Sequence, residues 1–153
     1  MDKPKAAAPS TAGLRGVAAA SSSVSDVNGE KGELIYQGYN IHDLASHSTF
    51  EEVIFLLWHK RLPTRPELEI LKQSIGEHYE LPKAVVGLMR QFPRDADPID
   101  VLRTAVSALE LYDDTGRDLS RPASLDTAVK LTAQFPALVA AADRLRRGLE
   151  PLQ

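Results

Sequence analysis

The sequence predicts a mainly α-helical fold in which a short N-terminal β-hairpin is followed by about six helices. Two short apolar pieces flank a turn sequence near residue 30, which indicates the hairpin. Apolar residues then recur every three or four positions along most of the chain, as on one face of a helix. Residues that commonly cap helices stand just before several of these segments. With 153 residues, the chain is long enough for one domain with a sizeable core.

The hairpin comprises the strand-like residues 24–27 and 33–36. The residues between them begin with Asn28-Gly29 and end with Gly32. Asn-Gly pairs and single glycines tolerate the positive φ angles that a tight reversal requires. Because two strands alone are marginal in water, the hairpin should lie against further structure.

Capping signals indicate where the helices begin. A Ser, Thr or Asp N-cap stands before an acidic first turn or before Pro at the first helical position, and both arrangements favour a helix N-terminus. These starts are Ser48 or Thr49 with Glu51 and Glu52, Thr64 with Glu67, and Asp97 with Pro98. With Pro82 and Ser124 as further starts and Gly148 as a stop, the expected helices cover residues 41–45, 50–61, 65–79, 82–91, 98–112 and 125–147.

Helical periodicity also predicts which side chains are buried. The second helix should bury Phe50, Val53, Ile54, Leu57 and Trp58. The fifth should bury Ile99, Leu102, Ala105, Val106 and Leu109. Pro136 lies inside the last predicted helix and should kink or divide it. The small residues within 137–142 allow a neighbouring helix to approach closely, so this segment should be central.

Composition excludes several classes of site and partner. The chain holds 18 Lys and Arg against 21 Asp and Glu, so no strong field favours nucleic acid or an anionic membrane. It has no Cys, which excludes disulfides, thiolate metal ligands and cysteine nucleophiles. No apolar run approaches the ~18 residues that span a bilayer. Residues 1–12 lack the apolar core of a signal peptide, so we expect a flexible tail there and a cytoplasmic protein.

The four histidines are the first candidates for acid–base chemistry: His42, His47, His59 and His78. None has a metal-ligand spacing such as His-Glu-x-x-His. Each lies beside polar neighbours in a turn or near a predicted helix end, so one interpretation is a solvated or capping histidine and the other is a general base. A general base requires a partner and a pocket, and the sequence indicates neither.

Paired acids and turn glycines also allow two interpretations. Glu51/Glu52 and Asp113/Asp114 fit a helix N-terminus and a loop, whereas catalysis requires two carboxyl groups in different environments. The remaining glycines in question are Gly29, Gly32 and Gly38, and their spacing matches neither of the phosphate-binding fingerprints. We therefore interpret these acids and glycines as structural.

A basic run near the C-terminus is the last candidate. Arg144, Arg146 and Arg147 stand just before Gly148. Cations there interact favourably with a helix dipole and the last carbonyl groups; an anion such as a CoA phosphate is the alternative. The residues alone therefore indicate no catalytic, cofactor-binding or metal-binding side chain.

Four blocks of the sequence resemble the citrate synthase family. They span residues 13–41, 47–64, 97–109 and 135–151, and the first is similar to the N-terminal signature of that family. The blocks follow the family order and spacing from residue 13 to the end of the chain. Residues 13–153 are therefore identified as a citrate synthase-like segment.

The resemblance implies a mostly helical, obligately dimeric enzyme whose large and small domains close over the substrates. This chain would be the N-terminal part of the large domain. The family condenses acetyl-CoA, or a related acyl-CoA, with oxaloacetate to give citrate or a methyl-substituted citrate. Its catalytic groups, two histidines and an aspartate, lie beyond the position that matches Gln153. The resemblance therefore implies no catalytic residue here, no cofactor besides the substrate acetyl-CoA, and an inactive chain.

Two residues depart from the family pattern: Gln37 stands where Arg is common, and Asp97 stands where His is common. Three accounts of the chain stay open. It is a partial citrate synthase, or a subunit of a split enzyme, or a non-enzymatic oligomerisation or interaction module. The expected partner is a second copy in a homodimer or a second chain that carries the missing C-terminal half, and neither nucleic acid nor a membrane. The sequence ends near a helix stop, which favours a boundary between elements.

Overall fold

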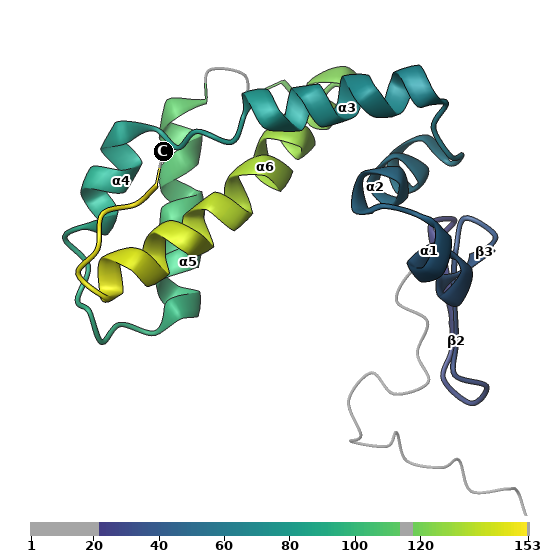
Figure 1. Ribbon diagram of the computed structural model, residues 1–153, viewed down its shortest axis with the longest axis horizontal. Coiled ribbons are helices and arrows are strands. Elements are labelled where there is room, and N and C mark those ends of the chain that lie inside the picture. The colour runs from purple at the N-terminus through teal and green to yellow at the C-terminus, as the bar shows by residue number, and fades with distance from the viewer. Residues whose placement is uncertain (1–21, 114–117, 153) are drawn as a thin grey trace, which may run out of the picture. The chain divides into compact units, whose positions relative to one another are not determined.

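The computed structural model describes residues 22–113 and 118–152. Contacts within the chain divide it between His47 and Ser48 into two compact units, which are described separately below (Figure 1). The tail expected at residues 1–12 lies outside the described residues.

The first unit holds a small antiparallel sheet with the strand order β1-β2-β3. Strand β1 (Ser25–Asn28) pairs with β2 (Glu33–Tyr36) so that Val27 lies opposite Leu34. This hairpin confirms the prediction from the Asn-Gly turn. Strand β3 (Tyr39–Asn40) adds a second hairpin that the sequence analysis did not foresee.

Helix α1 (Ile41–His47) follows β3 directly and packs on β2 and β3. The side-chain oxygen of Asn40 accepts a hydrogen bond from the N–H of His42 at 2.9 Å, so Asn40 caps the start of the helix. Leu44 is the buried side chain of α1 and is only 3% exposed. The helix runs two residues beyond the predicted end at residue 45.

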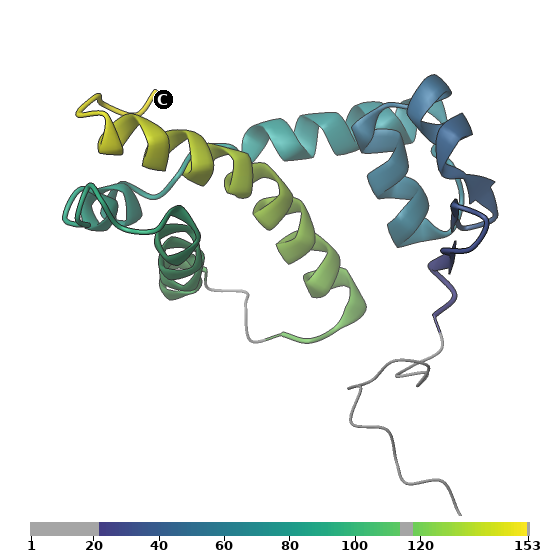
Figure 2. The same ribbon diagram turned by 90° about the horizontal axis from the view of Figure 1, so that it is seen from below.

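The second unit is helical throughout its regular elements. Figures 1 and 2 show two views of these helices. They are α2 (Phe50–His59), α3 (Arg65–Glu77), α4 (Lys83–Met89), α5 (Pro98–Leu109), a 3₁₀ turn (Glu110–Tyr112) and α6 (Arg121–Arg146). Helix α3 packs on α2 and on α6, whereas α4 and α5 pack on each other and on α6. The mainly α-helical fold with a short N-terminal hairpin is thus confirmed.

The predicted caps at three helices are confirmed. Glu52 accepts from the N–H of Thr49 at 2.7 Å and Thr49 accepts from the N–H of Glu52 at 3.4 Å, so Thr49 rather than Ser48 is the N-cap of α2. Glu67 accepts from the N–H and the hydroxyl of Thr64, both at 2.8 Å. Asp97 accepts from the N–H of Ile99 at 2.9 Å at the start of α5.

Helix α6 corrects the predicted N-cap and decides between the two outcomes expected at Pro136. Its N-cap is Ser120, whose hydroxyl accepts from the N–H of Ala123 at 3.5 Å, and not Ser124. Pro122 occupies the first turn, where its missing N–H costs nothing. The helix also continues through Pro136 as one 26-residue element rather than being divided, and its axis bends in the view of Figure 2.

The larger core cluster lies among α4, α5 and α6. Its buried residues are Val85, Met89, Ala105, Ala108, Leu109, Leu138 and Ala141. Four of these seven residues are Ala or Val. Their short side chains let the helix backbones approach closely. The expectation that residues 137–142 are central holds for Ala137, Leu138 and Ala141, while Val139 is 53% exposed.

A smaller cluster joins α2 and α3 through Ile54, Phe55 and Leu71. The predicted buried face of α2 is therefore partly wrong. Phe50 is 70% exposed, whereas Phe55 and Leu56 are buried. Phe50 stands at the first position of the helix, before any neighbouring helix covers it. Likewise Ile99, at the start of α5, is 66% exposed. Of the helices that the structure describes, none combines the length and the apolar character that a membrane span requires.

Candidate functional site

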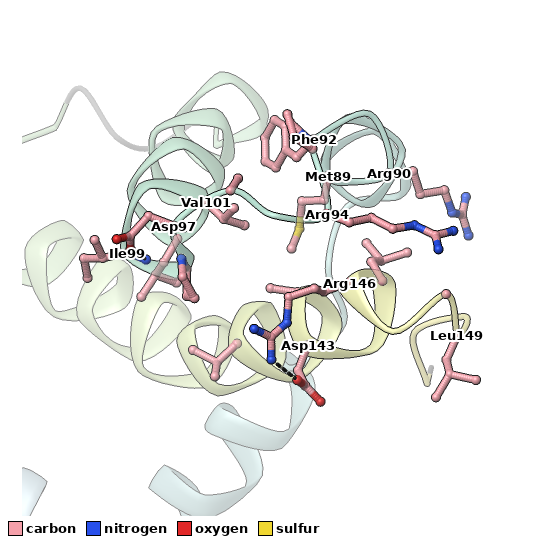
Figure 3. Close-up of a pocket in the computed structure, with 18 of the residues that line it drawn as sticks. Met89, Arg90, Phe92, Arg94, Asp97, Ile99, Val101, Asp143, Arg146 and Leu149 are labelled. Atoms are coloured by element: carbon pink, nitrogen blue, oxygen red, sulfur yellow. Dashed lines mark hydrogen bonds and ion pairs between the residues drawn. The ribbon is translucent and has the colours of Figure 1, made fainter.

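The second unit has a cavity of about 760 Å³ among α4, α5 and α6 (Figure 3). We call it the α5–α6 groove. Its wall comes from the end of α4, the segment that leads into α5, the first turns of α5 and the C-terminal turns of α6. The lining residues are Met89, Arg90, Phe92, Pro93, Arg94, Ala96, Asp97, Pro98, Ile99, Val101, Leu102, Val139, Ala142, Asp143, Leu145, Arg146, Gly148, Leu149 and Glu150.

The groove has an apolar floor and an apolar rim. Met89 is 3% exposed, and Leu102 and Leu145 are partly buried against the same core cluster. The rim residues remain open to solvent: Ile99 is 66%, Val139 53% and Leu149 42% exposed. Complete burial of a fully exposed aliphatic side chain of this size contributes about 1.5–3 kcal/mol, and covering these partly exposed ones would contribute a fraction of that. The rim therefore favours a further apolar surface against it.

Charged groups of the groove are mostly engaged with one another. Arg90 forms an ion pair with Glu150. Asp143 accepts from Arg146 at 3.1 Å and from Arg147 at 3.5 Å, and the first of these contacts is drawn in Figure 3. The hydrogen bond from Arg146, followed by that from Arg147, lowers the pKa of Asp143 from its usual range. Both pairs are exposed, so they orient side chains more than they stabilise the fold.

Arg94 differs from these residues. Within the described parts of the chain it makes no ion pair or hydrogen bond. Its guanidinium lies over Gly148, where a Cβ atom would be 3.6 Å from both terminal nitrogens. Helix α6 ends two residues before Gly148, at Arg146, so the cation stands near the negative end of the helix dipole. Its hydrogen-bond donors remain available to a further acceptor.

The chemistry that this arrangement allows is binding rather than proton transfer. Its carboxylates already have partners: Asp97 caps α5, Asp143 binds Arg146 and Glu150 binds Arg90. The lining contains no His, Ser, Thr or Tyr. A nucleophile and a general base must lie within hydrogen-bond reach of each other, and the groove offers no such pair.

The four candidate histidines lie elsewhere. The Nδ1 atom of His47 is 3.1 Å from the carbonyl oxygen of Asp43, and that of His78 is 2.8 Å from the carbonyl oxygen of Ser74. His59 stacks on Phe55 with 4.1 Å between the ring centroids. His42 is exposed on α1. These are local contacts within a helix turn, as the structural interpretation requires.

The other candidate groups also have structural partners. Glu52 caps α2, and Asp113 forms a 3.0 Å ion pair with Lys130. Asp114 lies outside the described residues. In the two described stretches, no group of three or more His, Asp or Glu side chains could hold a metal ion.

The basic run near the C-terminus forms a helix stop. Gly148 has a φ of 75°, its N–H donates to the carbonyl of Leu145 at 2.9 Å, and the N–H of Leu149 donates to that of Arg144 at 2.8 Å. The predicted glycine stop is confirmed. Arg146 and Arg147 both form ion pairs with Asp143. These contacts favour the structural interpretation of the run over anion binding.

The sequence analysis did not find the groove. Its walls come from residues 89–102 and 139–150, which are far apart in the chain. The two prolines of residues 92–98 indicated only an irregular connection between helices. This connection lies beside the end of α6 because of tertiary packing. The periodicity of apolar residues does not predict such packing.

Comparison with known proteins identifies the fold. The family model "Citrate synthase, C-terminal domain" matches residues 13–153. Citrate synthase 2 of Bacillus subtilis is 41% identical over 144 residues, which cover 94% of this chain and 38% of that protein. A 2-methylcitrate synthase of Mycobacterium tuberculosis is 36% identical over 140 residues, or 92% of this chain and 35% of that protein.

Solved structures agree. The crystal structure of citrate synthase from Pyrobaculum aerophilum matches with a TM-score of 0.84 and 38% identity, over 92% of this chain and 37% of that one. Citrate synthase from Thermoplasma acidophilum, in a ternary complex with carboxymethyl coenzyme A and oxaloacetate, matches with a TM-score of 0.82 and 26% identity, over 90% of this chain and 36% of that one. The chain thus spans little more than a third of its relatives' length. It belongs to the citrate synthase family.

Proposed function

We propose that this chain is the N-terminal part of the large domain of a citrate synthase-type enzyme. The complete enzyme would condense acetyl-CoA, or a related acyl-CoA, with oxaloacetate. The observation that carries the proposal is the family match over residues 13–153 combined with coverage of only 38% of a relative. The likeness of residues 13–41 to the N-terminal signature of the family supports the position at the start of the large domain.

We further propose that the chain alone is inactive. The condensation requires a base that removes a proton from the acetyl methyl group and donors that stabilise the developing oxyanion. The described histidines instead contact carbonyl groups one turn away or stack on a neighbour. The groove carboxylates are likewise engaged in caps and ion pairs. These contacts favour a structural role for this part of the fold.

The test is release of coenzyme A from acetyl-CoA and oxaloacetate, followed with a thiol reagent. Because the chain has no Cys, the reagent reports coenzyme A without a protein background. We expect the purified chain to give the same rate as buffer. Turnover that follows the chain through successive purification steps would contradict the proposed inactivity.

The partner of the chain is the second part of the proposal. The exposed apolar rim of the groove favours a covered surface in the functional assembly. A citrate synthase homodimer or a split enzyme with a second chain would each supply such a cover. A non-enzymatic interaction module in the cytoplasm is the alternative, and it would require a stable, self-sufficient monomer.

A further inference from the structure

We propose that Asn28 is a site of spontaneous covalent modification, at which the backbone nitrogen of Gly29 converts the asparagine into aspartate and isoaspartate. The two residues lie where β1 ends and the turn to β2 begins. The inference concerns the first unit alone and does not depend on the proposed enzyme assignment. It adds a chemical reaction that the folded chain carries out on itself.

The reaction joins two groups that are neighbours in the chain. Hydroxide removes the proton from the backbone nitrogen of Gly29, and this nitrogen attacks the side-chain carbon Cγ of Asn28. A succinimide ring forms, and the side-chain nitrogen leaves as ammonia. Water then opens the ring at either carbonyl, which gives aspartate or isoaspartate. Hydroxide and water are the only other reactants, and nothing is oxidised or reduced.

The turn leaves the attacking nitrogen accessible. Within the residues that the structure describes, the N–H of Gly29 donates no hydrogen bond. Gly29 is exposed, and a Cβ atom built on it would meet nothing within 4 Å. Hydroxide can therefore reach the N–H group that it must deprotonate.

The side chain of Asn28 lies over the same turn. Its Oδ1 atom accepts a hydrogen bond from the N–H of Lys31 at 3.1 Å. This bond draws electron density from the amide carbonyl and makes Cγ a better electrophile. The leaving Nδ2 group has no hydrogen-bond partner in the described part of the chain, so no contact has to break when ammonia departs.

The fold does not require a glycine at residue 29. An Asn-Gly pair in a tight hairpin usually supplies two positive φ angles. Among residues 28–32, all of which the structure describes, only Gly32 has a positive φ, at 67°. The missing side chain of Gly29 matters for the reaction instead, because a larger residue would hinder the approach of its nitrogen to Cγ.

The modification should loosen the hairpin. Asn28 pairs with Glu33 at the end of the β1–β2 ladder, so the new carboxylate would stand opposite an existing one. Like charges in such a pair are destabilising. Isoaspartate also adds a methylene group to the backbone, which then no longer matches the residue spacing of the partner strand. Amide hydrogen exchange of β2 should therefore be faster in the modified chain.

The experiment incubates the full, folded chain at a mildly alkaline and at a mildly acidic pH and follows each asparagine by peptide mass spectrometry. Replacing the side-chain NH2 group by OH raises the peptide mass, and an isoaspartyl methyltransferase labels the isoaspartate. The sequence has two asparagines, and Asn40 is the internal reference because it precedes the branched Ile41. We expect Asn28 to react at least about tenfold faster than Asn40 in alkali, and more slowly in acid because less hydroxide is present.

Two glycine variants separate the reaction from folding. Gly29→Ala should slow the reaction of Asn28 at least about tenfold, with unchanged amide exchange of β2, because neither the backbone nor the space there requires glycine. Gly76→Ala is the matched control, since a Cβ atom there also meets nothing within 4 Å, and the rate at Asn28 should stay the same.

Four results would overturn the proposal. They are equal rates at Asn28 and Asn40, a rate that does not rise with pH, a Gly29→Ala variant that reacts as fast as the unsubstituted chain, and a reaction that occurs only after urea has unfolded the chain.

Discussion

Gln37 holds a backbone conformation that few residues with a side chain adopt. It joins β2 to β3 together with Gly38, and both have positive φ angles, 48° and 88°. A two-residue hairpin turn with two positive φ angles favours Asn-Gly. The Nε2 atom of Gln37 is also buried without a hydrogen-bond partner among the described residues. Both features make this position suboptimal in the isolated chain.

Replacing Gln37 with Asn should therefore stabilise the first unit by roughly 0.5–1 kcal/mol. Asn tolerates the left-handed region better than Gln does. Amide hydrogen exchange of the β2 residues measures the change. Gly38→Ala is the matched opposite, because a Cβ atom there meets nothing within 4 Å and only the backbone is strained. It should accelerate exchange, and slower exchange in Gly38→Ala would contradict this account of the turn.

Leu138 anchors the larger core cluster and is fully buried. Leu138→Ala should lower the free energy of unfolding by roughly 2–5 kcal/mol, because it opens a cavity among α4, α5 and α6. Urea titration followed by the fluorescence of Trp58, the single tryptophan, measures the loss. The neighbouring Val139 is 53% exposed, and Val139→Ala should cost less than about 0.5 kcal/mol. Equal losses in the two variants would show that the helix phase is wrong.

Burial of single residues was only partly predictable from the sequence. Periodicity placed Leu102, Ala105 and Leu109 on one face, and Ala105 and Leu109 are buried. Leu102 is only half-buried because it lines the groove, and Ile99 is exposed at its rim. The periodicity of apolar residues predicts which side chains of a helix can be buried. Which of them a neighbouring helix covers depends on the tertiary packing.

At the scale of elements, Glu67 links the first turn of α3 to Arg61 and Thr64 in the segment between α2 and α3. Its carboxylate accepts from Thr64 and forms a bidentate pair with Arg61, with distances of 2.5 and 2.9 Å. The hydrogen bonds from Arg61 and then from Thr64 lower the pKa of Glu67 far below its usual range. The same contact raises the pKa of Arg61.

The stability of the second unit should therefore depend on Glu67 in acid. A carboxyl group with a lowered folded-state pKa stabilises the fold above its unfolded value of about 4.3, and this contribution is lost as the pH falls below that value. Thermal unfolding between about pH 5 and pH 2 should show a smaller acid-induced loss for Glu67→Gln than for the unsubstituted chain. Glu69→Gln, at an exposed position of the same helix, is the control. Parallel pH profiles for all three proteins would contradict the assignment.

Helix starts were the most predictable feature because caps are local. Thr49, Thr64 and Asp97 each bond within three residues of themselves. The start of α6 was missed although Ser120 and Pro122 form the same type of signal. Strand β3 was missed because it has only two residues and because its turn, Gln37-Gly38, lacks the Asn-Gly pair that usually indicates a hairpin. The groove could not be predicted, since it unites elements about 50 residues apart whose contact depends on packing.

At the scale of the whole molecule, the chain is a family segment with an uncovered apolar surface. We expect the isolated chain to bind an apolar fluorescent dye in its folded state, because the groove rim is open. Ile99→Asp should reduce the dye signal, whereas Arg65→Glu should leave it unchanged. A folded chain without any dye enhancement would favour the self-sufficient interaction module.

The central claim is that this chain is a segment of the citrate synthase fold that supplies structure and depends on the rest of the fold for catalysis. The most direct test replaces the matched residues of Bacillus subtilis citrate synthase 2 with this chain and compares coenzyme A release by the chimera and by the chain alone. The account predicts citrate formation by the chimera and a rate equal to buffer for the chain. A chimera that is folded by circular dichroism yet inactive, or a chain that is active without the remaining polypeptide, would contradict it.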